Sequence, residues 1–182
     1  MLELLDLPTA IITDLDIKRG NEGEGELSQV GSLDGRTTTN PTLKHFAKSA
    51  KLSNRMIESV RSRDKINIFT QTECSGYYPT SFEEALILQN ADNPLLHSAL
   101  ARQKPQAFKG IVGNPEAAAL LRENSYEYYC KLLKSKGNFA IELLHGLTTT
   151  QEDGSTATLL LPEYIQAAFT KLGEQLGGER DA

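Results

Sequence analysis

The sequence contains few cysteines and no long apolar run, and each shortage excludes a class of protein. Cys74 and Cys130 are the two cysteines in 182 residues, which is too few for a disulfide framework or a cysteine-based zinc site. The mean hydropathy is −0.36, and no apolar stretch is long enough to cross a bilayer. Residues 1–6 lack the basic start and apolar centre of a signal peptide. We therefore expect a cytoplasmic globular protein with no membrane partner.

Basic residues are also in short supply. Lysine and arginine total 19 against 24 acidic residues, and the net charge is −5. This balance argues against a broadly basic surface for nucleic acid. Bound divalent cations can invert the field at an acidic site, so the charge does not exclude an enzyme that acts on nucleic acid.

Several catalytic motifs are missing. The histidines His45, His97 and His145 have no partner four residues away, so a zinc-protease motif is absent. The sequence contains neither a G-x-S-x-G nucleophile elbow nor a P-loop. These absences exclude a serine hydrolase of that type and a P-loop nucleotide-binding core, and the histidines are interpreted as structural.

What is present is an apolar run that ends in two acids. Residues 10–12 follow Pro8 and are rich in β-branched side chains, which predicts a buried parallel strand. Asp14 and Asp16 come directly after it, at the edge of the sheet where open α/β proteins bind ligands. The pair can hold a hard divalent cation or act as nucleophile and acid/base. A strand that ends in a solvated acidic turn is the alternative.

The remaining pattern predicts an α/β fold. Residues 65–70 alternate in polarity and predict a second strand. Residues 18–36 and 148–158 are polar and predict loops, the first of them rich in glycine and glutamate over residues 20–35. Asn40-Pro41, Ser53 and Asn93-Pro94 are typical helix starts. The predicted helices cover residues 41–50, 53–63, 93–101, 114–134 and 163–176.

Two further segments carry candidate functional side chains. Ser81 predicts a helix N-cap that Glu84 could close as a capping box, with Glu83 in the first turn. Lys136 is predicted to lie between two helices, the first of which Gly137 would end. These residues could simply complement helix dipoles. Lys136 could instead stabilise phosphate charge beside a metal site.

Taken in order, four segments resemble the carboxyl-terminal half of an OLD-family (overcoming lysogenization defect) endonuclease. They are the D-L-D of residues 14–16, T-S-F-E of 80–83, K-G-N-F-A-I-E of 136–142 and L-P-E-Y-I of 161–165. The resemblance implies a partial Toprim (topoisomerase-primase) core over residues 1–90 and 136–176, a helical insertion over 91–135 and a flexible tail over 177–182. It also implies an ABC-type ATPase domain in the same parent protein, with ATP as that domain's cofactor.

The same resemblance implies a two-metal DNA endonuclease in phage or foreign-DNA defence, with Mg²⁺ or Mn²⁺ as cofactor. DNA, the ATPase domain and a second copy of the chain are the expected partners. Asp14 and Lys136 would be catalytic, the lysine by contacting the scissile phosphate. Glu142 matches a recurrent acid of the family that has no assigned role. The metal ligands implied by the match are Asp14, Asp16, Ser81 and Glu83.

One departure from the family pattern lies at the start of the sequence. A Toprim domain begins with a strand and a glutamate ahead of the D-x-D strand, and nothing before Pro8 matches them. The expectation is therefore a chain truncated at its amino-terminal end, whose activity depends on an upstream segment.

The sequence is also compatible with two other functions. A haloacid-dehalogenase-like phosphohydrolase would use Asp14 as nucleophile, Asp16 as acid/base, and Thr70 and Lys136 as phosphate contacts. That superfamily also needs a later pair of aspartates after a strand, which this sequence lacks. The third reading is a noncatalytic module that folds against the rest of a larger protein.

Overall fold

The computed structural model describes residues 7–18, 29–63, 65–149 and 157–177, which fall into two compact units. Within the described ranges, the first unit holds residues 7–18, 30–82 and 162–177, and the second holds residues 29, 83–149 and 157–161. None of the helices in these ranges combines the length and apolar character that a membrane span requires. The acidic loop of residues 20–35 and the tail of 177–182 lie mostly outside the described residues.

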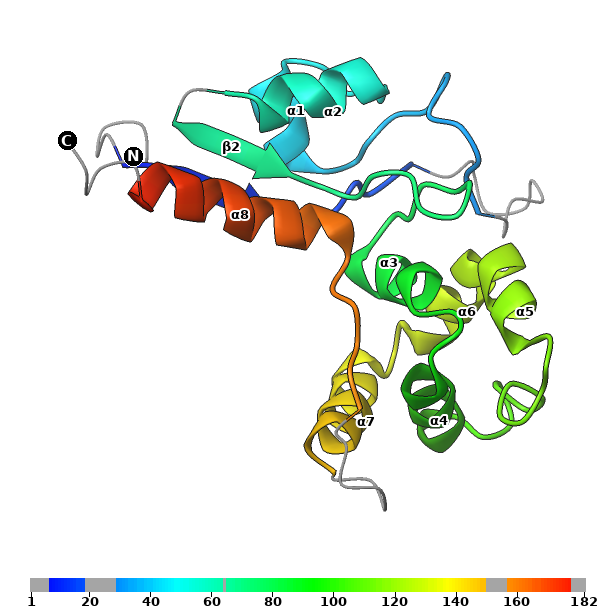
Figure 1. Ribbon diagram of the computed structural model, residues 1–182. Coiled ribbons are helices and arrows are strands. Elements are labelled where there is room, and N and C mark those ends of the chain that lie inside the picture. The colour runs from blue at the N-terminus through cyan, green and yellow to red at the C-terminus, as the bar shows by residue number, and fades with distance from the viewer. Residues whose placement is uncertain (1–6, 19–28, 64, 150–156, 178–182) are drawn as a thin grey trace. The chain divides into compact units, whose positions relative to one another are not determined.

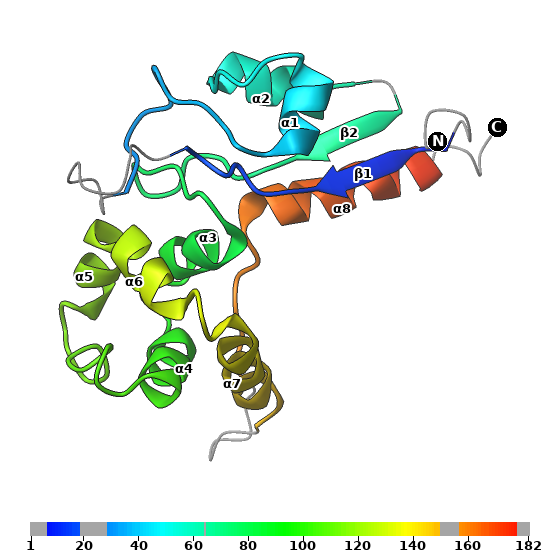
Figure 2. The same cartoon turned by 180° about the vertical axis from the view of Figure 1, so that it is seen from behind.

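The first unit is built on a parallel pair of strands. Strand β1 (Thr9–Ile12) pairs with β2 (Ile66–Phe69), and Ile12 lies opposite Phe69. Parallel strands need a long crossover, and the connection here contains α1 (Pro41–Ala47) and α2 (Asn54–Arg61). These helices lie on one side of the strands and α8 (Glu163–Gly177) lies on the other (Figures 1 and 2). The predicted α/β class is confirmed, and the arrangement is consistent with a partial Toprim-like fold.

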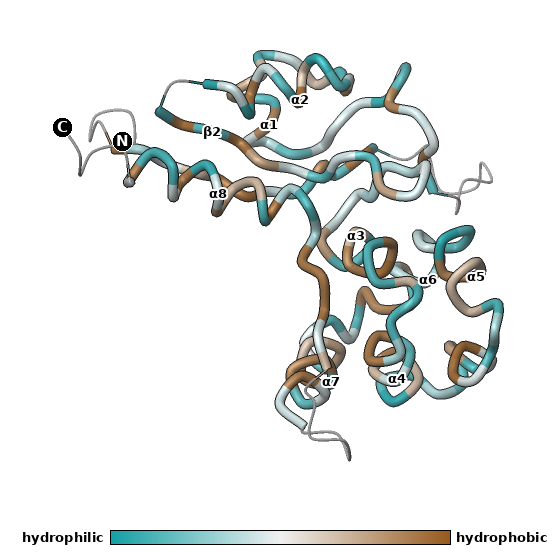
Figure 3. Tube along the Cα trace, viewed as in Figure 1, coloured by the Kyte–Doolittle hydropathy of each residue, from teal (hydrophilic) through white to brown (hydrophobic). Residues whose placement is uncertain are grey.

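The two faces of β2 pack on different partners. Ile66 and Ile68 join the apolar core beneath α1 and α2, together with Leu15 and Leu43. The alternate residues of β2 border a hollow shared with α8, as the period of two in a strand requires. Hydrophilic and hydrophobic stretches alternate along α8 (Figure 3), and its Tyr164 and Ala168 are buried. Both faces of the sheet are therefore covered, as in other parallel sheets.

The second unit is helical. The helix of residues 136–148 packs closely on the helix of residues 94–103. At this contact a Cβ on Gly146 would collide with the side chain of Leu95. Its helices are α3 (Phe82–Gln89), whose first residue belongs to the other unit, α4 (Pro94–Gln103), α5 (Ala117–Glu123), α6 (Ser125–Leu132) and α7 (Lys136–Thr148).

Three predicted helix starts are confirmed. The side chains of Asn40, Ser53 and Asn93 each accept hydrogen bonds from backbone N–H groups in the first turn of α1, α2 and α4. Proline occupies the first helical position after both asparagines. Such caps satisfy N–H groups that have no partner inside the helix, so these boundaries are set locally.

Two helix predictions are wrong. The single helix predicted over residues 114–134 is two helices, which meet at Asn124, whose backbone is not helical. The Asn124 side chain donates to the carbonyl of Leu120 at 3.0 Å, and the same carbonyl accepts from the Asn124 backbone N–H at 3.1 Å, which closes the end of α5. Gly137 does not end a helix: α6 stops at Leu132, a turn closes from Ser135 N–H to the Leu132 carbonyl, and α7 begins at Lys136.

The assignment of residues 1–90 and 136–176 to a Toprim core, and of 91–135 to an insertion, stays a prediction. The two compact units show which segments pack together. They do not show which segments belong to a Toprim core and which to an insertion.

Candidate functional site

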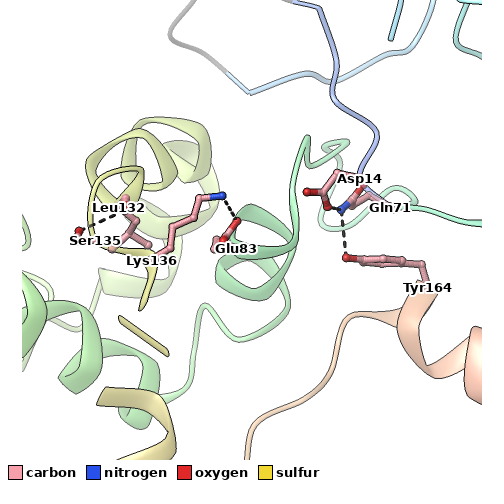
Figure 4. A network of polar contacts seen from close by, with 7 residues as sticks. All are labelled: Asp14, Gln71, Glu83, Leu132, Ser135, Lys136 and Tyr164. Carbon is pink, nitrogen blue, oxygen red and sulfur yellow. Dashed lines mark hydrogen bonds and ion pairs between the residues drawn. The ribbon is translucent and has the colours of Figure 1, made fainter. Parts of the chain in front are cut away.

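The Asp14 carboxylate lies just past the end of β1. Thr13 N–H still donates to the Phe69 carbonyl at 3.0 Å, so the parallel ladder continues one residue beyond the strand. In that register Asp14 is level with Gln71, since each lies two residues past a paired strand end. Gln71 Nε2 donates to Asp14 Oδ1 at 2.6 Å (Figure 4). The end of β2 therefore supplies a fixed donor to the first acid of the turn.

Gln71 is fully buried and uses both ends of its amide. Its Oε1 accepts from Leu15 N–H at 2.6 Å and from Thr70 Oγ1 at 3.1 Å. Its Nε2 donates to the hydroxyl of Tyr164 at 3.1 Å as well as to Asp14. The two donors at Oε1 fix which end of the amide faces the carboxylate.

Asn40 approaches the same turn from the start of α1. Its Oδ1 caps the helix, and its Nδ2 donates to Thr13 Oγ1 at 2.8 Å and to the Asp14 carbonyl at 2.7 Å. The same nitrogen lies 3.3 Å from Asp16 Oδ2, a longer hydrogen bond. Asn40 therefore links the first turn of a helix to both acids of the D-x-D segment.

The backbone at Asp16 is left-handed, with φ of 46°, a conformation that aspartate tolerates better than most residues. Asp16 N–H donates to the Thr80 carbonyl at 3.1 Å, and its own carbonyl accepts from Thr39 N–H at 2.9 Å. Ile17 N–H donates to Thr80 Oγ1 at 2.9 Å. Ser81 follows Thr80 directly and is buried, so its segment is bonded to the acidic turn.

In the second unit, Glu83 and Lys136 form an ion pair. Glu83 Oε2 lies 2.9 Å from Lys136 Nζ (Figure 4), and the side chains are 15% and 38% exposed. The ammonium also lies 5.1 Å from the centre of the Tyr129 ring, within the range of a cation–π contact. The predicted phosphate-contacting lysine therefore pairs with a predicted metal ligand.

The structure thus places the predicted site residues in two groups. Asp14, Asp16 and Ser81 belong to the first unit, and Glu83 and Lys136 belong to the second. Their roles as metal ligands and catalytic residues stay predictions.

Three other predicted residues have clear structural contacts. Glu142 pairs with Arg102 at 3.1 Å, which joins α7 to α4. The Glu84 carboxylate is buried and accepts from Ser125 Oγ at 3.1 Å. Thr70, a phosphate contact in the phosphohydrolase alternative, is buried and donates to Gln71. Because the Thr70 hydroxyl donates its hydrogen bond to the amide, it is not directed at a phosphate, which weakens the phosphohydrolase hypothesis.

The donors of the first unit suit a hard cation in chemistry. Asp14, Asp16 and Ser81 offer oxygen alone, which Mg²⁺ and Mn²⁺ prefer. Within the described part of the chain, no group of three or more histidine, cysteine, aspartate or glutamate side chains is clustered to hold a metal ion. A cation bound here would rely on few carboxylates, as is usual for Mg²⁺, which retains several waters.

Sequence reasoning missed Gln71 and Tyr164, and it assigned Asn40 to capping alone. The signal for Gln71 was its place directly after the second predicted strand, since Asp14 also follows a predicted strand closely.

Comparison with curated proteins finds a relative that matches nearly the whole chain. Endonuclease GajA of Bacillus cereus (strain HuB5-5) is 39% identical over an alignment 182 positions long, which covers 98% of this chain and 26% of the relative. That relative is an OLD-family nuclease. The chain is similar to one part of an OLD-family nuclease. The resemblance expected from the four segments is therefore confirmed.

The chain spans about a quarter of the length of this relative, since the match covers 26% of it. No family model matches the sequence. No solved structure matches it either.

Proposed function

We propose that this chain is the metal-dependent endonuclease part, of Toprim type, of an ATPase–nuclease that cuts DNA in phage or foreign-DNA defence. The observation that carries the proposal is the 39% identity to endonuclease GajA over 98% of the chain. The acidic turn supports it, because partly buried hydrogen bonds hold Asp14 and Asp16 after a parallel strand. Sheet edges of this kind are where α/β proteins bind their ligands.

In this proposal, Asp14, Asp16, Ser81 and Glu83 hold Mg²⁺ or Mn²⁺. Bound divalent cations supply Lewis acidity, activating water and neutralising the leaving oxygen of a phosphodiester. The chain contributes orientation: before any ligand arrives, Gln71 donates to the Asp14 carboxylate, and Asn40 donates to the Asp14 carbonyl and, at a longer 3.3 Å, to Asp16 Oδ2. Such preorganisation removes a cost that substrate binding would otherwise meet.

Lys136 contributes a positive charge for a phosphate oxygen. In the structure this ammonium is paired with Glu83. A phosphate at Lys136 and a cation at Glu83 would each replace a partner in that pair, so the two binding events are expected to favour one another.

The test is a plasmid-nicking assay. The 182-residue chain is assayed alone and joined behind the residues that precede the matching segment in the Bacillus cereus relative, with Mg²⁺, Mn²⁺ or EDTA. We expect cation-dependent nicking that Asp14→Ala and Lys136→Ala each reduce by more than about 100-fold, since loss of an outer-shell partner alone costs 10–100-fold. Asp34→Ala removes an exposed acid of the same unit and is the matched control.

Nicking that persists unchanged in both Asp14→Ala and Lys136→Ala would overturn the proposal. Covalent trapping of an aspartyl-phosphate mimic at Asp14 would favour the phosphohydrolase alternative instead.

A further inference from the structure

We infer that Gln71 is a positioning residue for the metal site: its side-chain amide sets the orientation of the Asp14 carboxylate and thereby the affinity for the divalent cation. The inference rests on the proposed function. It starts from the 2.6 Å hydrogen bond from Gln71 Nε2 to Asp14 Oδ1. This bond joins side chains 57 residues apart in sequence through the register of the two strands.

The Gln71 side chain is held rigidly. Gln71 is 0% exposed, and its amide makes hydrogen bonds in four directions. Two donors, Leu15 N–H and Thr70 Oγ1, face Oε1, and two acceptors, Asp14 and Tyr164, face Nε2. Rotating the amide by 180° would place Oε1 against the carboxylate and Nε2 against a backbone N–H. One orientation is therefore fixed, and it points a donor at Asp14.

The Gln71 amide is neutral, so it leaves the negative charge of Asp14 available to a cation. A neutral amide orients a carboxylate without cancelling its charge, whereas a lysine or arginine at the same place would compete with a cation. A carboxylate has about four lone-pair sites, so one N–H donor leaves it able to bind a metal. Gln71 therefore has the properties of an outer-shell partner that prepares a ligand.

Orientation of the Asp14 carboxylate by Gln71 can be distinguished from a contribution of Gln71 to packing. Tyr164 is buried, and its hydroxyl accepts from the same amide nitrogen. Removing that hydroxyl changes the buried network and leaves the bond from Gln71 to Asp14 in place. A general loss of packing and a specific loss of carboxylate orientation can thus be told apart with two variants of one network.

The experiment measures Mn²⁺ binding to the full 182-residue chain by titration calorimetry, beside thermal unfolding without metal. Gln71→Met removes the donor at similar length, and we expect its Kd for Mn²⁺ to rise by about 10–100-fold. Tyr164→Phe is the matched control and is expected to lower the unfolding midpoint while its Kd stays unchanged. Equal Kd values for wild type and Gln71→Met would overturn the positioning role.

A second measurement uses the wild-type chain, in case Gln71→Met does not fold. The Gln71 side-chain amide is followed by nuclear magnetic resonance during a Mg²⁺ titration. We expect a saturable shift of its Nε2 protons with the same Kd as calorimetry gives for Mg²⁺. If the chemical shift of the Nε2 protons does not change while Mg²⁺ binds, the role of Gln71 is overturned and the proposed metal site is not. Absence of any Mn²⁺ or Mg²⁺ binding by wild type would overturn the proposed metal site, and the inference with it.

Discussion

The acidic turn after β1 and the ion pair between α3 and α7 hold carboxylates in opposite ways. Asp14 and Asp16 are held by the neutral amides of Gln71 and Asn40, while Glu83 is held by a partly exposed ammonium. Neutral donors fix a carboxylate and leave its charge, but an ammonium neutralises it. In the proposed metal site, the turn would therefore be prepared for a cation in advance, whereas Glu83 would exchange one positive partner for another.

The largest expected effect comes from cutting the link between α1 and the turn. Asn40→Ala removes a helix cap and the donor to the partly buried Asp14 carbonyl, so we expect a loss of about 2–4 kcal/mol in the free energy of unfolding. Asn93→Ala removes the cap of α4 and one exposed hydrogen bond, to the Thr158 carbonyl, and should cost about 1 kcal/mol. Urea unfolding of both variants measures the difference. Equal losses would mean that Asn40 is only a cap.

A smaller effect is expected at Thr80, which supports the backbone of the turn. Thr80→Val preserves the shape of the side chain and removes the acceptor of Ile17 N–H, and we expect a cost of about 1–3 kcal/mol for that buried donor. Thr170→Val changes an exposed residue of α8 and should stay within about 0.5 kcal/mol. The measurement is again urea unfolding. A Thr80→Val loss no greater than that of Thr170→Val would show that the turn does not depend on this bond.

The smallest effect is expected at the ion pair. A double-mutant cycle of Glu83→Gln and Lys136→Met should give a coupling energy of at most about 1 kcal/mol, because the lysine is partly exposed. Raising the salt from about 0.05 to 1 M should reduce that coupling, while the cost of Asn40→Ala should hardly change. Thermal unfolding at both salt concentrations checks this. If the coupling energy between Glu83 and Lys136 is the same at both salt concentrations, the ion pair is a fixed structural contact, as the hydrogen bonds of the acidic turn are.

The sequence was most informative where the cause was local. Asn40, Ser53 and Asn93 act on N–H groups within three residues, so their helix starts could be read directly. The break at Asn124 was missed because an asparagine within an otherwise periodic helix gives a weak signal. Gln71 was missed because its partners Leu15 and Tyr164 lie 56 and 93 residues away. Strand pairing brings Leu15 to Gln71, and packing of α8 on the strands brings Tyr164.

The candidate site divides in the same way. Asp14 and Asp16 could be predicted from an apolar strand followed by acids, since strand ends and ligand sites coincide in α/β proteins. The pairing of Lys136 with Glu83 could not, because it depends on how α3 and α7 pack.

The left-handed backbone of Asp16, with φ of 46°, restricts which substitutions can be interpreted. Most side chains are strained by about 1–2 kcal/mol in this conformation, whereas glycine and asparagine adopt it readily. Alanine scanning at this position would therefore combine a conformational penalty with the loss of the carboxylate. Asparagine retains both the shape and the backbone preference, so Asp16→Asn isolates the charge. The backbone conformation alone would allow aspartate, asparagine or glycine at position 16, and of these only aspartate keeps the proposed carboxylate ligand.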